Sequence, residues 1–413
     1  MLSVLFITNH YPPDIGAASN RSKHVVKALR QKGLRVDVLT SRPVYPNPTL
    51  YRSHTEWKKN NDSPYGRTRY LYAISKGYTR FPFLFRLINQ LIFFMLASFF
   101  VLRKGRHYAL VVTSSPPFPV NAIGMLAKIV YRCKWVTEIR DLWPASLNAV
   151  GKLSRKSLLY KLLKRMELFF YRTCDGIALL APGMERRLEL DGIPSEKLTT
   201  ITNGIPEWID QHKQNHVAEG TLTVRYIGTI GHAQDFTPLL RMARQNPDIR
   251  FELIGEGMYK NQLEKIIRRE SLVNVYVKSG IVNKEEIIEA YLGADVGYIG
   301  LKSHDLFAHV IPSKLFEYGA LGIPIVYFGP PDSDCSTMIQ KYGLGEWLSA
   351  TEDVGEERLR QIIKNYLAKS RVKGFRRDFS WDAIGERYYE FLRARGCLYG
   401  QKSVHDSVES FHN

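Results

Sequence analysis

Short apolar segments alternate with longer amphipathic ones along most of the chain. In the first half, the segments expected to be strands are Leu2–Thr8, Arg35–Thr40, Tyr108–Thr113, Lys134–Ile139 and Asp175–Leu180. Helices are expected between them, for example over Ala17–Lys32 and Val120–Tyr131. Strands that alternate with helices indicate parallel units, because parallel neighbours need a long crossover connection. The alternation therefore predicts an α/β fold.

The alternation is interrupted once, near residue 205. The segment TTITNGIPEWID is followed by the polar, turn-rich QHKQNHVAEG, a composition typical of a domain boundary. Further strands are expected within residues 222–228, 251–257, 273–279, 296–301 and 324–329. A chain of 413 residues is also too long for one ordinary core. We therefore predict two Rossmann-like domains facing each other across a cleft, with ligands at the carboxyl ends of the strands.

The formal net charge of +18 indicates an anionic partner. The sequence has no zinc-finger, RNP-type or helix-turn-helix signature, so nucleic acid is not the expected partner. The basic residues gather instead around two apolar segments, 81–106 and 151–172. Both segments fit helices on an anionic membrane surface. The alternatives are insertion of residues 81–102 into the bilayer, or packing of both helices on a sheet with solvated basic faces.

Cysteine usage and the N-terminus bear on the compartment. The cysteines are Cys133, Cys174, Cys335 and Cys397, with no CxxC or zinc spacing, which indicates reduced thiols. The N-terminus, MLSVLFITNH, has no basic n-region and no small-residue cleavage site, so it is expected to be a buried strand and not a signal peptide. These features predict a cytoplasmic protein. The polar segment 396–413 is expected to be disordered.

Three strand-to-helix junctions of the second half carry residues suited to binding an anion. In chain order they hold Gly228 and Gly231, then Gly255 and Gly257, then Ser313 and Lys314. Glycine lets the backbone approach a phosphate, and the N–H groups of the following helix point at it. An ammonium adds a full charge. Each glycine pair is also compatible with an ordinary tight turn, and neither a GxGxxG motif at the first junction nor a GxxxxGK[ST] loop is present.

Ordered motifs over nearly the whole chain resemble those of one enzyme family. They are NHYPPDIGAASNR (9–21), VVTSSPPF (111–118), EIRDLWPAS (138–146), ITNGI (201–205), RYIGTIG (225–231), ELIGEG (252–257), ADVGYIGL (294–301), IPSKLFEYGALGIPI (311–325) and FSW (379–381). Several motifs are weak individually, whereas the ordered set is specific. The chain resembles the retaining glycosyltransferases of family 4, which have the GT-B fold. It is most similar to the bacterial members that assemble O-antigen or capsule on a lipid carrier.

The resemblance implies a role for each domain. Residues 1–205 would bind the acceptor, and residues 206–380 would bind the nucleotide sugar. The helix 381–395 would cross back onto the first domain, and 396–413 would form a flexible tail. The family generally has no strict metal requirement, so no metal and no other cofactor are predicted.

The resemblance also assigns residues of the donor site. Glu317 interrupts an apolar run and could simply face solvent, but it matches the family glutamate that accepts hydrogen bonds from the ribose hydroxyls. The family carries a second glutamate eight residues earlier, where this chain has His309. His309 or the nearby Asp305 would therefore contact the sugar.

The leaving diphosphate and the acceptor need partners of their own. Lys314, the 228–231 loop and Arg225 would neutralise the diphosphate, and the nucleobase would lie against the Ser279–Val282 loop. In the first domain, Gly16 resembles the glycine of the family loop that approaches diphosphate and acceptor. Arg140 stands where the family often has a histidine. Asp141, the next residue, would orient the acceptor or stabilise positive charge at the anomeric carbon, unless it only caps a turn.

The expected function is transfer of a sugar from a nucleoside-diphosphate donor to a lipid-pyrophosphate-linked glycan on the inner face of the plasma membrane. The resemblance favours a UDP-linked hexose or N-acetylhexosamine as the donor. One alternative is another GT-B enzyme, such as a nucleotide-sugar epimerase or a phosphorylase. The other is a membrane- or nucleic-acid-binding protein without catalysis. That last reading leaves the three anion-binding junctions unexplained.

Overall fold

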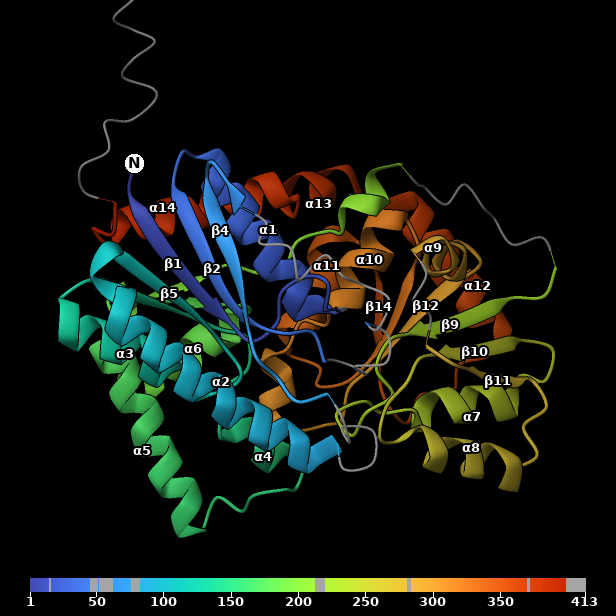
Figure 1. Cartoon of the computed structure of the whole chain (residues 1–413). Coiled ribbons are helices and arrows are strands. Elements are labelled where there is room, and N and C mark those ends of the chain that lie inside the picture. The colour runs from blue at the N-terminus through green and yellow to red at the C-terminus, as the bar shows by residue number, and fades with distance from the viewer. Residues whose placement is uncertain are drawn as a thin grey trace, which may run out of the picture.

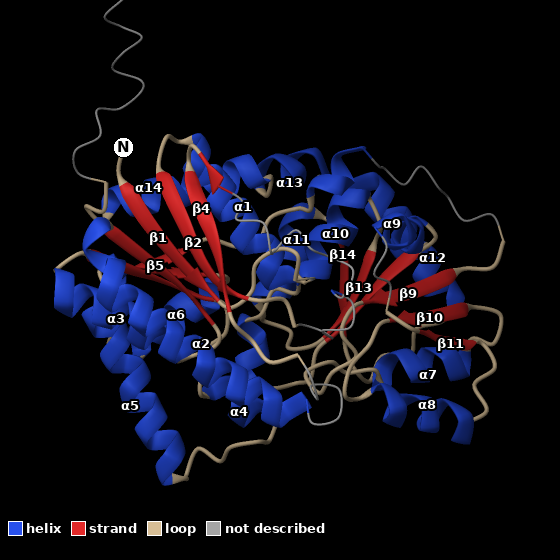
Figure 2. Ribbon diagram, viewed as in Figure 1, coloured by secondary structure: helices blue, strands red, loops and turns tan. Residues whose placement is uncertain are grey.

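The computed structural model describes residues 1–14, 16–44, 51, 62–75, 82–211, 220–280, 284–369 and 372–398. Their strands form two separate sheets, each flanked by helices (Figures 1 and 2). The predicted α/β fold with two Rossmann-like domains is confirmed. Most of the predicted tail lies outside the described residues.

The first sheet has eight strands in the order β3-β4-β2-β1-β5-β6-β7-β8. They are β1 (Ser3–Thr8), β2 (Arg35–Ser41), β3 (Asp62–Ser63), β4 (Gly66–Leu71), β5 (Leu110–Ser115), β6 (Lys134–Ile139), β7 (Gly176–Leu179) and β8 (Leu198–Thr200). Only the edge pair β3–β4 is antiparallel. The central strands bury nearly every residue because helices cover both faces of a parallel sheet. The edge strands β3, β4 and β8 were not predicted, because they are short or alternate with exposed polar residues.

The second sheet has six parallel strands in the order β11-β10-β9-β12-β13-β14. They are β9 (Thr223–Ile227), β10 (Arg250–Ile254), β11 (Val275–Lys278), β12 (Val296–Gly300), β13 (Ile325–Phe328) and β14 (Gly345–Leu348). The direction of strand addition reverses between β9 and β12, and in the first sheet between β1 and β5. Such switch points are where open α/β sheets bind their ligands, at the carboxyl ends of the strands.

Helices surround both sheets. They are α1 (Ala17–Gln31), α2 (Pro82–Lys104), α3 (Val120–Tyr131), α4 (Ala145–Ala149), α5 (Leu158–Thr173), α6 (Pro182–Leu190), α7 (Thr237–Gln245), α8 (Lys260–Arg269), α9 (Lys284–Leu292), α10 (Ser313–Leu321), α11 (Asp334–Tyr342), α12 (Glu356–Lys369), α13 (Val372–Asp378) and α14 (Trp381–Ala394). Short 3-10 turns include η3 (Gly105–His107), η5 (Glu207–Gln211) and η6 (Asp305–His309).

The first sheet is covered by helices from both ends of the chain. Helices α2, α3 and α5 lie on one face, and α1 lies on the other, together with α14 from the far end of the chain (Figure 1). A Cβ atom on Gly385 of α14 would lie 2.4 Å from Cβ of Ala28 on α1. The two helices therefore approach closely because position 385 has no side chain.

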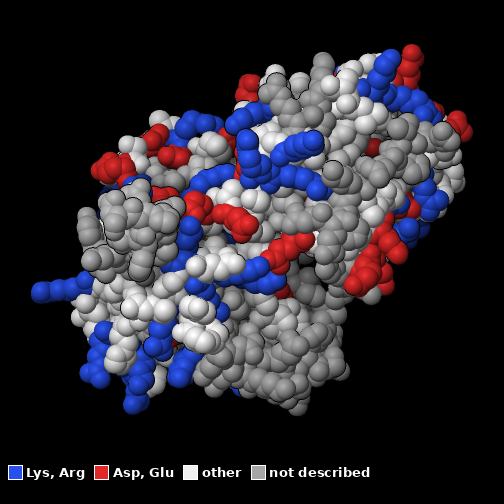
Figure 3. Space-filling model, turned by 90° about the horizontal axis from the view of Figure 1, so that it is seen from above, with Lys and Arg blue, Asp and Glu red and all other residues white. Residues whose placement is uncertain are grey.

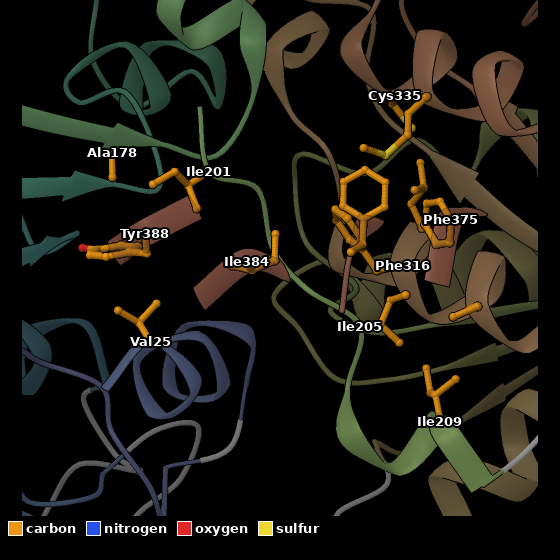
Figure 4. Packing of buried hydrophobic residues seen from close by; sticks show 14 of the residues in the cluster. Val25, Ala178, Ile201, Ile205, Ile209, Phe316, Cys335, Phe375, Ile384 and Tyr388 are labelled. Carbon is orange, nitrogen blue, oxygen red and sulfur yellow. The ribbon is translucent and has the colours of Figure 1, made fainter. Parts of the chain in front are cut away.

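One apolar core continues from the first domain into the second. Figure 4 shows Val25 of α1 beside Ile384 and Tyr388 of α14, while Phe316 of α10 and Phe375 of α13 lie on the second-domain side. The segment that crosses between the sheets supplies three further members, all buried: Ile201, Ile205 and Ile209. The crossing segment is therefore part of the core and not a loose linker.

A fully buried ion pair fixes the start of this crossing. Arg21 of α1 and Glu138 of β6 are 1% and 0% exposed, and their Nε and Oε2 atoms lie 2.8 Å apart. The two remaining guanidinium nitrogens donate to the carbonyls of Thr202 and Ile201. The second carboxylate oxygen accepts from Ser114, 2.8 Å away. One arginine thereby joins a helix, a strand and the crossing segment.

A second polar contact joins the domains on the other side. The carboxylate of Asp334, at the start of α11, accepts from the backbone N–H of Gly183 at 2.7 Å and from Arg186 at 3.1 Å. Gly183 lies in the first turn of α6, so a second-domain carboxylate caps a first-domain helix. His309 of η6 packs on the same glycine: a Cβ at position 183 would lie 2.0 Å from its Nδ1 atom.

We expect Arg21→Met to lower the free energy of unfolding by about 3–5 kcal/mol, because it leaves the buried Glu138 carboxylate without its counter-ion. Urea unfolding followed by circular dichroism measures the change. The matched control is Lys32→Met, which removes an exposed pair with Glu386 and should cost about 1 kcal/mol or less. Equal losses in the two variants would show that the buried pair has no special role.

Gly183→Ala should separate the two domains, because the new methyl group has no room against His309. Small-angle scattering should report a larger radius of gyration than in the wild type. Gly374→Ala in α13 is the control, since a Cβ there meets nothing within 4 Å, and alanine favours the helix by about 1 kcal/mol. An unchanged scattering curve for Gly183→Ala would contradict the assigned contact.

Candidate active site

Most of the predicted site residues lie where the carboxyl ends of the two sheets meet. Helix α6 and the loop before α4 follow strands of the first sheet, and η6 follows β12 of the second. These elements are in contact: η6 packs against α6 and α4. The site is therefore built from both domains.

Lys314 is the central cation on the second-domain side. Its side chain is only 8% exposed, and its ammonium lies 3.7 Å from the centroid of the Tyr226 ring. Among the described residues it makes no hydrogen bond or ion pair. Burial lowers the pKa of Lys314 to about 7, and the negative charge of Glu317 opposes that shift. A buried ammonium without an ion-pair partner among the described residues can accept an anionic ligand.

The start of α10 adds backbone donors beside this ammonium. Pro312 is the N-cap residue, and no side chain caps the helix, so the first-turn N–H groups, including that of Ser313, are available. Proline fixes the extended backbone that leads into the helix. Uncapped N–H groups at a helix N-terminus, together with an ammonium, form a site for a phosphate.

Glu317 lies one turn further along α10, next to Lys314. It is partly buried, and the Tyr291 hydroxyl donates a hydrogen bond to its Oε2 atom. Burial raises the pKa of Glu317, while Tyr291 and Lys314 lower it. The carboxylate is thus held by one donor and retains acceptor capacity for another ligand. Glu317 is not a stray charge on a solvated helix face.

The two glycine junctions pack against each other beside this cluster. Gly228 has a φ of 139° and lies beside the Lys314 side chain. A Cβ atom added at position 228 would lie 3.2 Å from the Lys314 Nζ atom. A Cβ on Gly255 would lie 1.8 Å from the Gly228 carbonyl oxygen, and one on Gly257 would lie 2.1 Å from that of Ile230. The loops therefore need glycine for their own close approach, besides any approach to a ligand.

Three other predictions for the second domain concern Gly231, Arg225 and the Ser279–Val282 loop. The Gly231 amide donates to the Gln234 side chain at 3.0 Å. Arg225 does not join the phosphate cluster, because its guanidinium pairs with Glu252 at 2.6 Å and donates to the Ala290 carbonyl. That expectation was wrong: successive side chains of a strand point to opposite faces of the sheet, and the one at position 225 faces α9. The predicted Ser279–Val282 loop lies partly outside the described residues.

His309 and Asp305 begin and end the 3-10 turn η6. Burial lowers the pKa of His309, and the charges that act on it come from Asp334, Arg186, Arg187 and Asp305. Its surroundings are thus the interdomain contact at α6. The Nδ1 atom of His309 is buried without a hydrogen-bond partner among the described residues.

On the first-domain side, Arg140 and Asp141 follow β6. The Arg140 guanidinium donates to the carbonyls of Ser115 and Pro116 and so holds the loop after β5. Desolvation by the surrounding protein raises the pKa of the Asp141 carboxyl group, and the charge of Arg140 lowers it. Gly16, with a φ of 138°, begins α1 at the carboxyl end of β1. The left-handed φ favours glycine at this position.

Sequence reasoning missed several partners. Tyr226 and Tyr291 support Lys314 and Glu317, but they lie on other elements and have no local signal. Asp332 and Asp334 form a DxD pattern. The Asp334 carboxylate caps α6, and the described residues contain no group of three His, Cys, Asp or Glu side chains suited to a metal.

Comparisons with known proteins concern the family and the fold. Residues 16–204 match the glycosyl transferase 4-like domain family. WbjE of Pseudomonas aeruginosa, named as a glycosyltransferase, is 22% identical over 265 residues, which are 59% of this chain and 62% of WbjE. WcaI of Escherichia coli K12, named as a colanic acid biosynthesis glycosyl transferase, is 21% identical over 347 residues, 78% of this chain and 82% of WcaI. The WbjE alignment thus spans less than two thirds of that relative.

Solved structures with the same architecture include sucrose-phosphate synthase of Thermosynechococcus elongatus. It has a TM-score of 0.68 and 16% identity over 95% of this chain and 98% of that one. HepE of Anabaena, solved with UDP-glucose, has a TM-score of 0.63 and 13% identity over 95% of this chain and 100% of its own. At these identities the likeness concerns the fold. The two-domain architecture is the GT-B fold, and residues 16–204 of the chain match the glycosyl transferase 4-like domain.

Proposed function

We propose that this protein transfers a sugar from a nucleoside-diphosphate donor to a glycan acceptor in bacterial surface polysaccharide synthesis, with retention of anomeric configuration. The observation that carries the proposal is Lys314, a buried ammonium at the uncapped start of α10 that forms no ion pair or hydrogen bond with the described residues. Burying such a charge costs stability unless a ligand compensates it. A diphosphate is a ligand of matching charge.

The donor would bind along the switch point of the second sheet. Its diphosphate would receive the Lys314 ammonium, the first-turn amides of α10 and the backbone of the 228–231 loop. The Glu317 carboxylate would accept hydrogen bonds from two ribose hydroxyls. HepE, which shares the fold, was solved with UDP-glucose, and this supports a UDP-linked sugar here.

The acceptor would approach from the first domain, near Gly16 and Asp141. During transfer the bond between the anomeric carbon and the diphosphate oxygen breaks, the acceptor oxygen bonds to that carbon on the same face, and the proton of the acceptor hydroxyl passes to the leaving diphosphate. Lys314 stabilises the negative charge that develops on the diphosphate. Asp141 would orient the acceptor hydroxyl or stabilise the positive charge at the anomeric carbon, and the neighbouring Arg140 ties this segment to the loop after β5.

A lipid-linked acceptor and membrane association complete the proposal. Two helices on one face of the first domain carry exposed apolar side chains. On α2 these include Leu84, Leu87, Leu91, Met95 and Phe99, and on α5 they include Leu158, Leu159, Leu162 and Phe169. By length and composition, residues 84–107 could cross a membrane. Within their apolar stretch, 22% of the residues are buried inside the protein. Because Phe93, Ala97 and Val101 of α2 pack into the core, we propose that this helix lies along a cytoplasmic membrane surface.

Binding of UDP should take up a proton above pH 7. Lys314 is charged below a pKa of about 7 and largely neutral above it in the free protein, whereas the bound diphosphate favours the charged form. The affinity should therefore fall by up to tenfold per unit between pH 7.5 and 9. Titration calorimetry in buffers of different ionisation enthalpy measures the uptake.

Lys314→Met is the matching variant. It should abolish the proton uptake and weaken UDP binding roughly ten- to a hundredfold at pH 7. It should also raise the melting temperature, most clearly below pH 7, because the cost of the buried charge is then full and is lost as the pH rises towards the unfolded pKa. Lys364→Met, exposed on α12, should change none of these quantities. Unaltered UDP affinity in Lys314→Met would refute the diphosphate site.

Steady-state kinetics of sugar transfer to lipid-pyrophosphate acceptors distinguish the role of Glu317 in donor binding from the role of Asp141 in the transfer step. Glu317→Ala should raise the donor KM roughly ten- to a hundredfold, because two ribose hydrogen bonds are lost. Asp141→Asn should lower kcat about a hundredfold or more with little change in donor KM. Glu264→Ala, on α8, is the control. If Glu317→Ala transfers as well as the wild type, the ribose assignment is wrong, and epimerised donor without transfer would favour an epimerase.

A further inference from the structure

A second basic site lies at the opposite edge of the first sheet. A cavity of about 660 Å³ opens between the edge strand β4 and the last turns of α2, a volume in the range of small-ligand sites. Its charged lining is Arg35, Arg67, Arg69, Arg103, Lys104 and Asp37. Five cations thus face one carboxylate.

The cations are held in place by the fold. Positions 67, 69 and 71 of β4 alternate with residues that point to the other face of the sheet, so both arginines and Leu71 face α2. Arg69 stacks on Phe100 of α2 at 5.7 Å, and Arg103 stacks on Phe99 at 5.3 Å. These contacts leave the guanidinium edges available for hydrogen bonds.

Among the described residues, Asp37 is the acidic residue that lines this cavity. Asp37 is already engaged: Oδ1 accepts from the Arg67 amide and Oδ2 from the Tyr108 hydroxyl, each at 2.8 Å. Within the part of the chain that the structure describes, Arg35, Arg69 and Arg103 form no ion pair with a carboxylate. Lys104, also exposed, has none either. The cavity therefore presents positive charge to an external ligand.

The cavity is continuous with the apolar surface of α2. Exposed Leu91, Met95, Phe99 and Leu102 follow one another at helical spacing towards it. Segments 82–107 and 151–166 contain no Asp or Glu at all. Figure 3, which views the molecule from above, shows Lys and Arg gathered at the lower left, at the first-domain end. An apolar stripe that ends in a cationic cavity matches the boundary between lipid chains and lipid headgroups.

We propose that this cavity binds the phosphate-bearing headgroup of an anionic phospholipid while the apolar stripe of α2 enters the interfacial layer. The inference deepens the membrane association proposed above and rests on it. Arginine suits this role because its planar guanidinium group forms bidentate hydrogen bonds with phosphate.

This headgroup site is separate from the candidate active site. The cavity is lined by Ser3 and Arg35 at the amino ends of β1 and β2 and by the last turns of α2, whereas Gly16 and Asp141 follow the carboxyl ends of β1 and β6. A lipid held at one end and the stripe along α2 fix the orientation of the first domain on the membrane. The catalytic edge then has a defined position for a membrane-borne acceptor.

Vesicle binding tests the proposal with the full chain and three paired substitutions. The pocket variant is Arg35→Gln/Arg103→Gln. A second pair, Arg155→Gln/Lys156→Gln, removes the same charge from the loop before α5 on the same face. The third, Arg268→Gln/Arg269→Gln, removes it from α8 of the second domain. Binding to phosphatidylglycerol and phosphatidylcholine vesicles is measured by co-sedimentation, and folding by thermal unfolding.

The pocket pair should weaken binding to phosphatidylglycerol vesicles about thirtyfold, from about 1 kcal/mol per cation near an anionic surface. The loop pair should lose clearly less and the α8 pair almost nothing. Equal losses in the pocket and loop pairs would mean a diffuse charge effect and overturn the proposal. So would wild-type binding to phosphatidylcholine as strong as to phosphatidylglycerol.

Soluble probes separate a lipid from a free phosphate. Glycerol phosphate should compete weakly with vesicles and, without vesicles, should not stabilise the protein at millimolar concentration. Strong stabilisation that the pocket pair abolishes would identify a soluble phosphate ligand and overturn the lipid assignment. Transfer to a detergent-solubilised acceptor should be unchanged in the pocket pair. Absence of transfer in every form, with intact headgroup discrimination, would refute the proposed function and leave this inference standing.

Discussion

The buried pair between Arg21 and Glu138 is the constraint on which the arrangement of the two domains depends. Neither charge can be left alone in the core, so α1, β6 and the start of the crossing segment must meet at one point. From there Ile201, Ile205 and Ile209 continue the apolar core into the second domain. The relative position of the two sheets thus begins as a requirement of charge burial.

The free-energy cost of burying a charge also bears on the second domain, with a different consequence. The charge of Arg21 is neutralised by the carboxylate of Glu138. The ammonium of Lys314 instead packs on the Tyr226 ring, and the negative charge of Glu317 only opposes the lowering of its pKa. A compensated ion belongs to the architecture, and an uncompensated one indicates a missing ligand. This contrast is the strongest argument for the donor site, because both observations come from the same chain and the same principle.

The first sheet separates two roles along its strands. Its carboxyl edge meets the second domain and carries Gly16, Arg140 and Asp141. Its amino edge carries the cationic cavity, and α2 runs from one edge to the other. Crossover connections in parallel sheets place helices on the faces and loops at the edges, so the proposed membrane-facing helix and the proposed catalytic edge are compatible in one domain.

The sequence by itself determined the α/β class, the central strands of both sheets and the helix that carries Lys314 and Glu317, because apolar periodicity and glycine placement are local signals. It could not reveal the outer strands β3, β4, β8 and β14, whose pairing depends on distant partners. Nor could it show that Arg225 pairs with Glu252 or that Asp334 caps α6, since these contacts join residues far apart in the chain. Burial decided the rest: only the tertiary structure distinguishes a solvated Lys314 from a desolvated one, because its state depends on what surrounds it in space.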